Sequence, residues 1–217
     1  MDAQISAWVR GVEAACRRAR VEYVLHGPEV LREYGGDGVF QAFERLMGEV
    51  PEMTWRTMVS DWARWQFLGR HGAGTLYLDT DNRLTRGLFP DFSRLAPGLW
   101  CHGEGFEPRL PAAGCMYARG EAGASIGRMA AQLSTGKVLG ILELDKAGRA
   151  ALYADILRRG RLVYWLGPGW MRRVVEPQAR DRGLQVAVLP QDVASSRNEG
   201  AWIYHAGRGD WLHKVEP

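Results

Sequence analysis

The segment Ser60–Gly87 limits most strongly what this chain can fold into, because it changes from a helical to a strand pattern within a few residues. Its first part spaces apolar residues at helical intervals, and the glycine-rich turn His71–Thr75 follows, as expected beyond the end of a helix. The apolar run Leu76–Leu78 then predicts a short buried strand, and Asp79 and Asp81 come directly after it. The segment therefore predicts a helix, a tight turn and a strand that ends in two carboxylates.

Asp79 and Asp81 are candidate metal ligands. In β geometry, residues i and i+2 point the same way, so we expect both carboxylates to face one point just outside a sheet. Divalent cations that carry a diphosphate take such oxygen ligands. Upstream, Asp61 and Arg64 lie three residues apart on the predicted helix, so they share a face within reach of that point. Taken alone, such a pair is more often a solvated ion pair on a helix surface.

This combination resembles the core of the DXD-motif sugar transferases, a family that includes mannosyltransferases, capsular-polysaccharide transferases and the glucosylating toxins of clostridia. The shared elements are Ser60-Asp61-x-x-Arg64, the glycine turn and Leu76–Asp81, in this order and spacing. The similarity extends over roughly residues 5–213. It implies an α/β fold, namely a single GT-A-like, Rossmann-related domain over residues 1–217 with a mixed central sheet flanked by helices.

The end of the sequence adds to the resemblance. A short strand is predicted to end at His205, and a glycine-rich loop follows and leads to Trp211. Members of the family often close with a histidine and a small-residue loop that ends in tryptophan. The resemblance therefore implies His205 as a third metal ligand and Trp211 as an indole N–H donor to a bridging oxygen. A histidine at the end of a strand is just as often a structural hydrogen-bonding residue, and both interpretations stay open at this point.

The resemblance also implies the chemistry: a metal-dependent glycosyltransferase that uses a UDP- or GDP-sugar with Mn²⁺ or Mg²⁺ and retains the anomeric configuration. The implied catalytic residues are Asp79, Asp81, Arg64 and Trp211. The implied substrate-binding residues are Asp61, Arg64, Tyr77, Asp79, Gly74 and Trp211. The implied metal ligands are Asp79, Asp81 and His205.

Two other functions are open. The first is transfer to a polyanionic acceptor such as modified DNA, because residues 155–183 contain seven arginines against three acids. The second is a nucleotide-sugar-binding module without turnover. Three departures from the family motivate it: the leading strand is missing or reduced to Met1–Gln4, Ala73 separates the paired glycines, and Ala113-Gly114 stands where the family has an asparagine.

Composition is consistent with one globular domain, since 46% of the 217 residues are hydrophobic and 24% are charged. The three cysteines match neither zinc-ligand spacing nor a disulfide framework, which favours a reducing compartment. No signal-peptide pattern opens the sequence, and no apolar run approaches the ~20 residues of a membrane span. We therefore expect a cytoplasmic protein.

Periodicity and turn residues predict the remaining elements. The predicted helices are 3–19, two short helices within 29–48, 52–70, 121–133, 147–159 and 167–175. The predicted strands are 21–25, 99–102, 114–118 and 162–166.

Overall fold

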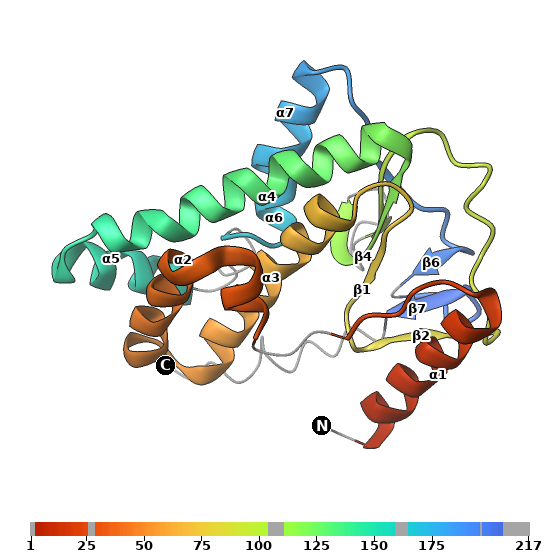
Figure 1. The fold of residues 1–217 in the computed structure, drawn as a ribbon, viewed down its shortest axis with the longest axis horizontal. Coiled ribbons are helices and arrows are strands. Elements are labelled where there is room, and N and C mark those ends of the chain that lie inside the picture. Colours follow the sequence, from red (N-terminus) through yellow and green to blue (C-terminus); the bar gives the residue numbers. More distant parts are fainter. Residues whose placement is uncertain (1–2, 26–28, 104–110, 159–164, 196, 206–217) are drawn as a thin grey trace.

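The structure is a computed structural model that describes residues 3–25, 29–103, 111–158, 165–195 and 197–205. These residues form an α/β arrangement in which two small mixed sheets lie beside a group of long helices (Figure 1). The predicted fold class is confirmed at this level. The strands are divided between two sheets, whereas the sequence predicted one central sheet.

Most helices match their predicted ranges, but the helix predicted over 121–133 extends to Glu143, and the second part of the predicted helix 167–175 is a π-helix. The predicted break within residues 29–48 is confirmed, because Gly36 interrupts the second helix with a φ of 67°. The described helices are α1 (Ala3–Ala19), α2 (Val30–Glu49), α3 (Glu52–His71), α4 (Gly120–Glu143), α5 (Lys146–Leu157), α6 (Pro168–Trp170), the π-helix Met171–Val175 and α7 (Glu176–Asp181).

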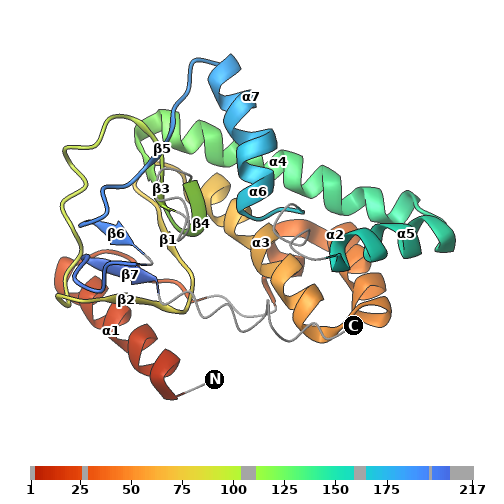
Figure 2. The same cartoon turned by 180° about the vertical axis from the view of Figure 1, so that it is seen from behind.

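The larger sheet has the strand order β1-β4-β3-β5, in which only the β3–β5 pair is parallel. Its strands are β1 (Leu76–Leu78), β4 (Pro111–Arg119), β3 (Gly98–Gly103) and β5 (Val186–Val188). The smaller sheet has the order β2-β7-β6 and consists of β2 (Asn82–Leu84), β7 (Ile203–His205) and β6 (Ala194–Ser195). Figure 2 shows this sheet at the end of the molecule away from α5.

The main core lies between the helices and the larger sheet. Trp62 and Trp65 of α3 are fully buried there, and α4 packs against both α3 and strands β3 and β4. Each indole has a partner, since Trp65 Nε1 donates to Leu166 O at 2.9 Å and Trp62 Nε1 donates to Thr135 Oγ1 at 3.3 Å. Burying two such rings with their N–H groups satisfied fixes α3 firmly, and α3 carries Asp61 and Arg64.

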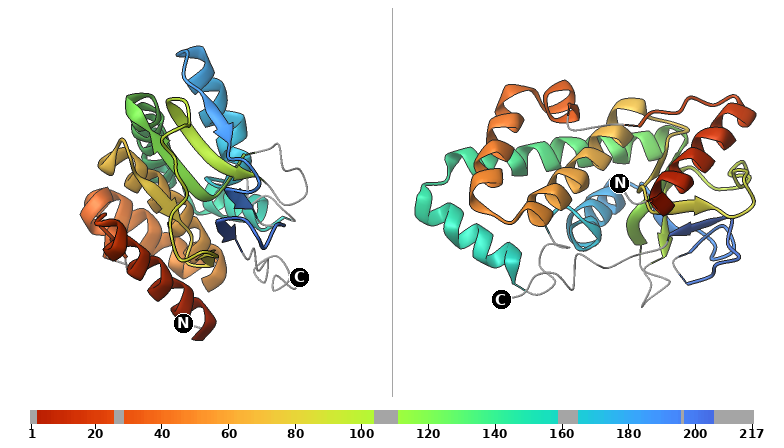
Figure 3. Two further views of the ribbon diagram at one scale, coloured as in Figure 1. Left: turned by 90° about the vertical axis from the view of Figure 1, so that its right-hand side faces the viewer. Right: turned by 90° about the horizontal axis from the view of Figure 1, so that it is seen from below.

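One predicted strand differs from the structure. Val21–Leu25 has no regular secondary structure and joins neither sheet, while α1, which precedes it, packs beside β2 (Figure 3). Val21 is therefore 51% exposed and Leu25 is 54% exposed. The predicted strand 162–166 falls mostly outside the described residues.

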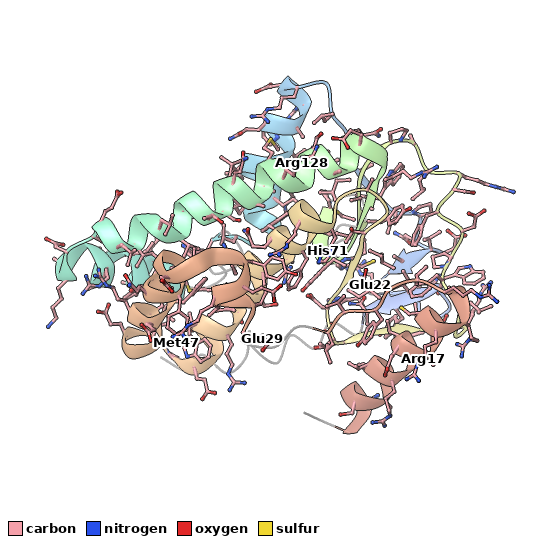
Figure 4. All side chains as sticks on the ribbon, in the orientation of Figure 1. Arg17, Glu22, Glu29, Met47, His71 and Arg128 are labelled. Carbon is pink, nitrogen blue, oxygen red and sulfur yellow. The ribbon has the colours of Figure 1, made fainter. Side chains whose placement is uncertain are left out.

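The outer faces of the long helices are charged. Arg17 of α1 and Arg128 of α4 project outward in Figure 4 and form ion pairs with Glu13 and Glu121 along their own helices. Such exposed pairs contribute little to stability because solvent screens their charges. Within the described residues, no helix combines the length and apolar character needed to cross a membrane.

Candidate metal centre

The two aspartates lie in a turn that connects the two sheets. Strand β1 ends at Leu78, the backbone N–H of Asn82 donates to Asp79 O at 3.0 Å, and β2 begins at Asn82. Asp79 and Asp81 therefore approach each other through the Asp79–Asn82 turn. The sequence predicted that strand alternation would align them, and this was wrong because the strand ends at Leu78, before either aspartate.

Asn82 holds this turn in place, a role that the sequence analysis missed. Its side chain is 2% exposed, and its Nδ2 donates to Asp79 O and to Gly114 O, both at 2.9 Å. The N–H of Asp79 also donates to Gly114 O at 2.8 Å. An asparagine just after Asp-Thr-Asp is a recognisable turn residue, so the signal was present in the sequence.

Pairing of β2 with β7 brings His205 to the aspartates. The antiparallel register places Asn82 opposite His205, which sets the imidazole beside the turn. His205 Nε2 lies 3.2 Å from Asp81 Oδ1 and 3.8 Å from Asp79 Oδ2. One donor atom from each of the three residues lies within 4.8 Å of the other two. We call Asp79, Asp81 and His205 the Asp-Asp-His cluster.

The two oxygens of Asp79 have different surroundings. Oδ1 accepts a hydrogen bond from the Tyr77 hydroxyl at 2.5 Å and lies 3.5 Å from Arg64 Nη2. Oδ2 faces His205 instead. Since Oδ1 is already engaged by Tyr77 and Arg64, Asp79 is oriented to offer a ligand through Oδ2 alone.

Arg64 and Asp61 form a buried pair behind the cluster. Their closest atoms are 2.9 Å apart, and the side chains are 7% and 6% exposed. Arg64 Nη2 also lies 3.5 Å from Asp79 Oδ1, so the same nitrogen contacts both carboxylates. The predicted pair thus exists as a buried link from α3 to the turn, rather than the solvated ion pair that was its alternative.

The charges of these residues shift one another's pKa values. Burial raises the pKa of Asp61 to about 6, against the opposing effect of Arg64. Burial also disfavours ionised Asp79, but Arg64 and hydrogen bonds from His205 and Tyr77 outweigh it and lower the pKa of Asp79 to about 2. Burial disfavours protonated His205, but the two carboxylates beside it, Asp79 and Asp81, raise its pKa to about 9. The cluster therefore holds negative charge that attracts a proton or another cation.

The cluster fits a divalent cation. Asp81 Oδ1 is buried and, among the described residues, accepts no hydrogen bond of good geometry, although His205 Nε2 lies close to it. A buried carboxylate oxygen of this kind is costly unless a cation balances it, and protonated His205 is that cation until a divalent ion displaces its proton. Mn²⁺ accepts two carboxylate oxygens and an imidazole nitrogen as ligands. Mg²⁺ prefers oxygen ligands, so it would use mainly the two carboxylates.

Gly114 leaves space for the cluster. The sequence analysis gave this residue a different interpretation. A Cβ atom placed on Gly114 would lie 2.6 Å from His205 Nε2 and 3.1 Å from Asp79 Oδ2. Any side chain at this position would therefore displace the imidazole or the carboxylate. The sequence analysis treated Ala113-Gly114 as the loss of a polar contact, whereas the structure gives the glycine a steric reason.

A second histidine, His102, was not identified from the sequence. It is 3% exposed, and its ring lies 4.8 Å from that of His205 between centroids, at an angle of 42°. Burial, with the nearby His205 cation as a second cause, lowers the pKa of His102 to about 3. His102 is therefore a neutral imidazole beside the Asp-Asp-His cluster.

The remaining predicted site residues are further from the cluster or outside the described chain. Gly74 lies in the turn before β1, where its N–H donates to Ala118 O at 2.8 Å and its φ is 87°. Trp211 falls outside the described residues. Among the arginines of 155–183, Arg180 and Arg182 are exposed at the end of α7, which lies well apart from β2 and β7 in Figures 1 and 2.

Comparison with known proteins adds no relative: no family model, curated protein or solved structure matches the chain.

Proposed function

We propose that this chain is a metal-dependent, retaining glycosyltransferase that uses a nucleotide sugar, a UDP- or GDP-sugar, as donor. The observation that supports this most directly is the convergence of Asp79, Asp81 and His205, which come from two distant parts of the sequence. The resemblance to the DXD-motif sugar transferases, and with it the GT-A-like domain, is part of the same proposal.

The reaction breaks the bond between the sugar C1 and the diphosphate oxygen. The acceptor hydroxyl oxygen forms the new bond to C1 on the same face, and its proton passes to the leaving diphosphate. Negative charge develops on the leaving group while C1 becomes cationic, so the site must stabilise both. When bound, Mn²⁺ or Mg²⁺ supplies a Lewis acid that neutralises the diphosphate.

The residues of the chain have separate tasks in this mechanism. Asp79, Asp81 and His205 hold the cation, and Tyr77 fixes which oxygen of Asp79 is offered. The pKa of Arg64 is raised because the carboxylates of Asp79 and Asp61 outweigh the burial that opposes its charge. Arg64 therefore stays cationic and holds Asp79 in place. Its buried Nε forms no hydrogen bond within the described residues.

Turnover with and without metal tests the proposal. Purified protein is incubated with UDP- and GDP-sugars in Mn²⁺ or in chelator, and released nucleoside diphosphate is measured. We expect metal-dependent release, and Asp81→Asn should lower it about 100-fold or more, since one electrostatic group at the reacting centre is removed. Asp181→Asn, an exposed substitution at the end of α7, is the matched control and should leave release unchanged. Equal turnover of the two variants would refute the metal assignment.

The binding module without turnover is the second candidate, and the same experiment separates it from the enzyme. It predicts that calorimetry detects nucleotide binding with Mn²⁺ while no donor is hydrolysed or transferred.

The polyanionic acceptor also stays a prediction. If it binds through 155–183, Arg180→Ala with Arg182→Ala should weaken DNA binding and reduce its salt dependence. Because α7 lies well apart from the cluster, one bound polymer that contacts both is disfavoured.

A further inference from the structure

We propose that His102 is a positioning residue that holds the imidazole of His205 in place for metal binding, a role that rests on the proposed metal centre. The two rings are in contact, yet His102 is almost fully buried and comes from a different sheet. A ligand from β7 is thereby supported by a side chain from β3.

An irregularity in the larger sheet places His102 there. The β3–β4 register shifts between Cys101, which pairs with Met116, and His102, which pairs with Ala112. The intervening residues of β4 form a bulge, which includes Gly114 and Cys115. Bulges of this kind redirect side chains and are frequent next to active sites.

The side chain of His102 replaces a hydrogen bond that the bulge removes from the ladder. Its Nδ1 accepts from the backbone N–H of Cys115 at 3.1 Å. Because Nδ1 is the acceptor, a neutral His102 carries its proton on Nε2. The bond fixes both the tautomer and the plane of the ring.

His205 therefore contacts two rigid surfaces. The ring of His102 contacts it on one side, and the backbone of Gly114 lies so close that a single Cβ atom would collide with Nε2. The bulge produces both surfaces, since it places Gly114 and the N–H of Cys115. Ligating histidines oriented in advance bind metal more tightly because less freedom is lost on binding.

Two substitutions separate this role from simple satisfaction of the Cys115 N–H. His102→Asn keeps an acceptor atom at the position of Nδ1 but removes the ring. His102→Phe keeps the ring but removes the acceptor. The experiment titrates the whole protein with Mn²⁺, measures free Mn²⁺ by electron paramagnetic resonance, and records the Tm of each variant.

If His102 positions His205, His102→Asn weakens Mn²⁺ binding about 10-fold or more with little change in Tm. His102→Phe then lowers Tm while Mn²⁺ affinity stays within about 3-fold of wild type. In a His205→Ala background, His102→Asn should cause no further loss, because the residue that it positions is gone.

The reverse pattern overturns the inference: normal Mn²⁺ affinity in His102→Asn, or a loss that persists in the His205→Ala background. An affinity that simply follows Tm across the variants also overturns it. If the wild-type protein itself does not bind Mn²⁺, the proposed metal centre fails and this inference fails with it. If the wild-type protein binds and only the variants behave otherwise, the inference fails alone.

Discussion

At the scale of single residues, the candidate site contains a buried charge that costs stability. Asp61 is 4% exposed, and burial raises its pKa although Arg64 lies 2.9 Å away. Arg64 is shared with Asp79, so one guanidinium balances two carboxylates. Such a pair is more readily explained by what it positions than by what it adds to stability.

The pKa of Asp61 predicts how stability depends on pH. Its value rises from 3.8 to about 6 on folding, so between these values the folded state binds more protons than the unfolded state. The free energy of unfolding should therefore fall as pH rises through this window, by about 3 kcal/mol from Asp61 alone. Urea unfolding of wild type and Asp61→Asn at pH 4 to 7 measures this contribution. A stability difference between the two proteins that stays constant across the range would contradict it.

Gly114 gives a second prediction at this scale. Gly114→Ala places a methyl group 2.6 Å from His205 Nε2, so the imidazole must move away from the aspartates. We expect Mn²⁺ affinity to fall about 10-fold or more, as when the geometry of a ligand is disturbed. Calorimetric titration measures the change. Gly140→Ala in α4, where a Cβ meets nothing within 4 Å, should leave affinity unchanged.

At the scale of elements, two glycines let α3 and α4 approach each other closely. A Cβ on Gly127 of α4 would lie 2.7 Å from Leu68 O, and a Cβ on Gly69 of α3 would lie 2.8 Å from the Cβ of Ala131. Because α3 carries Asp61 and Arg64, this contact also sets the depth of the buried pair behind the cluster.

Two substitutions in α4 should therefore have opposite effects. Gly127→Ala should destabilise the protein by about 1–3 kcal/mol, since the methyl group meets the backbone of α3. Gly136→Ala, in the same helix but with open space around it, should stabilise by up to about 1 kcal/mol through helix propensity. Denaturant unfolding of both variants provides the test, and equal effects would refute the close helix contact.

At the scale of the whole molecule, the Asp-Asp-His cluster joins the two sheets. Asp79 and Asp81 lie in the turn between β1 and β2, while His205 ends β7 of the smaller sheet. A cation bound there links residues that are far apart in the chain, and an unfolded chain does not bring these ligands together.

Metal should accordingly stabilise the fold. At Mn²⁺ concentrations of about 100 times Kd, linkage adds about 2.7 kcal/mol, which for a chain of this size corresponds to a rise in Tm of roughly 5–10 °C. Differential scanning calorimetry with Mn²⁺ and with chelator measures the rise. Asp79→Asn and His205→Ala should each remove most of it, and an equal rise in these variants would locate the metal elsewhere.

The sequence by itself determined the features that depend on neighbouring residues. The long helix α3 and the break at Gly36 follow from periodicity and glycine, because helix hydrogen bonds join residues only four apart. The Asp-x-Asp pair and the histidine that ends a strand were also visible as local patterns.

Only the tertiary structure decided which of these residues meet. Strand pairing depends on partners far along the chain, so the two-sheet division and the missing strand at Val21–Leu25 were not predictable from local patterns. The same holds for His102 and Gly114, which reach the cluster through a bulge in β4. The sequence named candidate ligands, and long-range pairing of β2 with β7 placed three of them within 4.8 Å of one another.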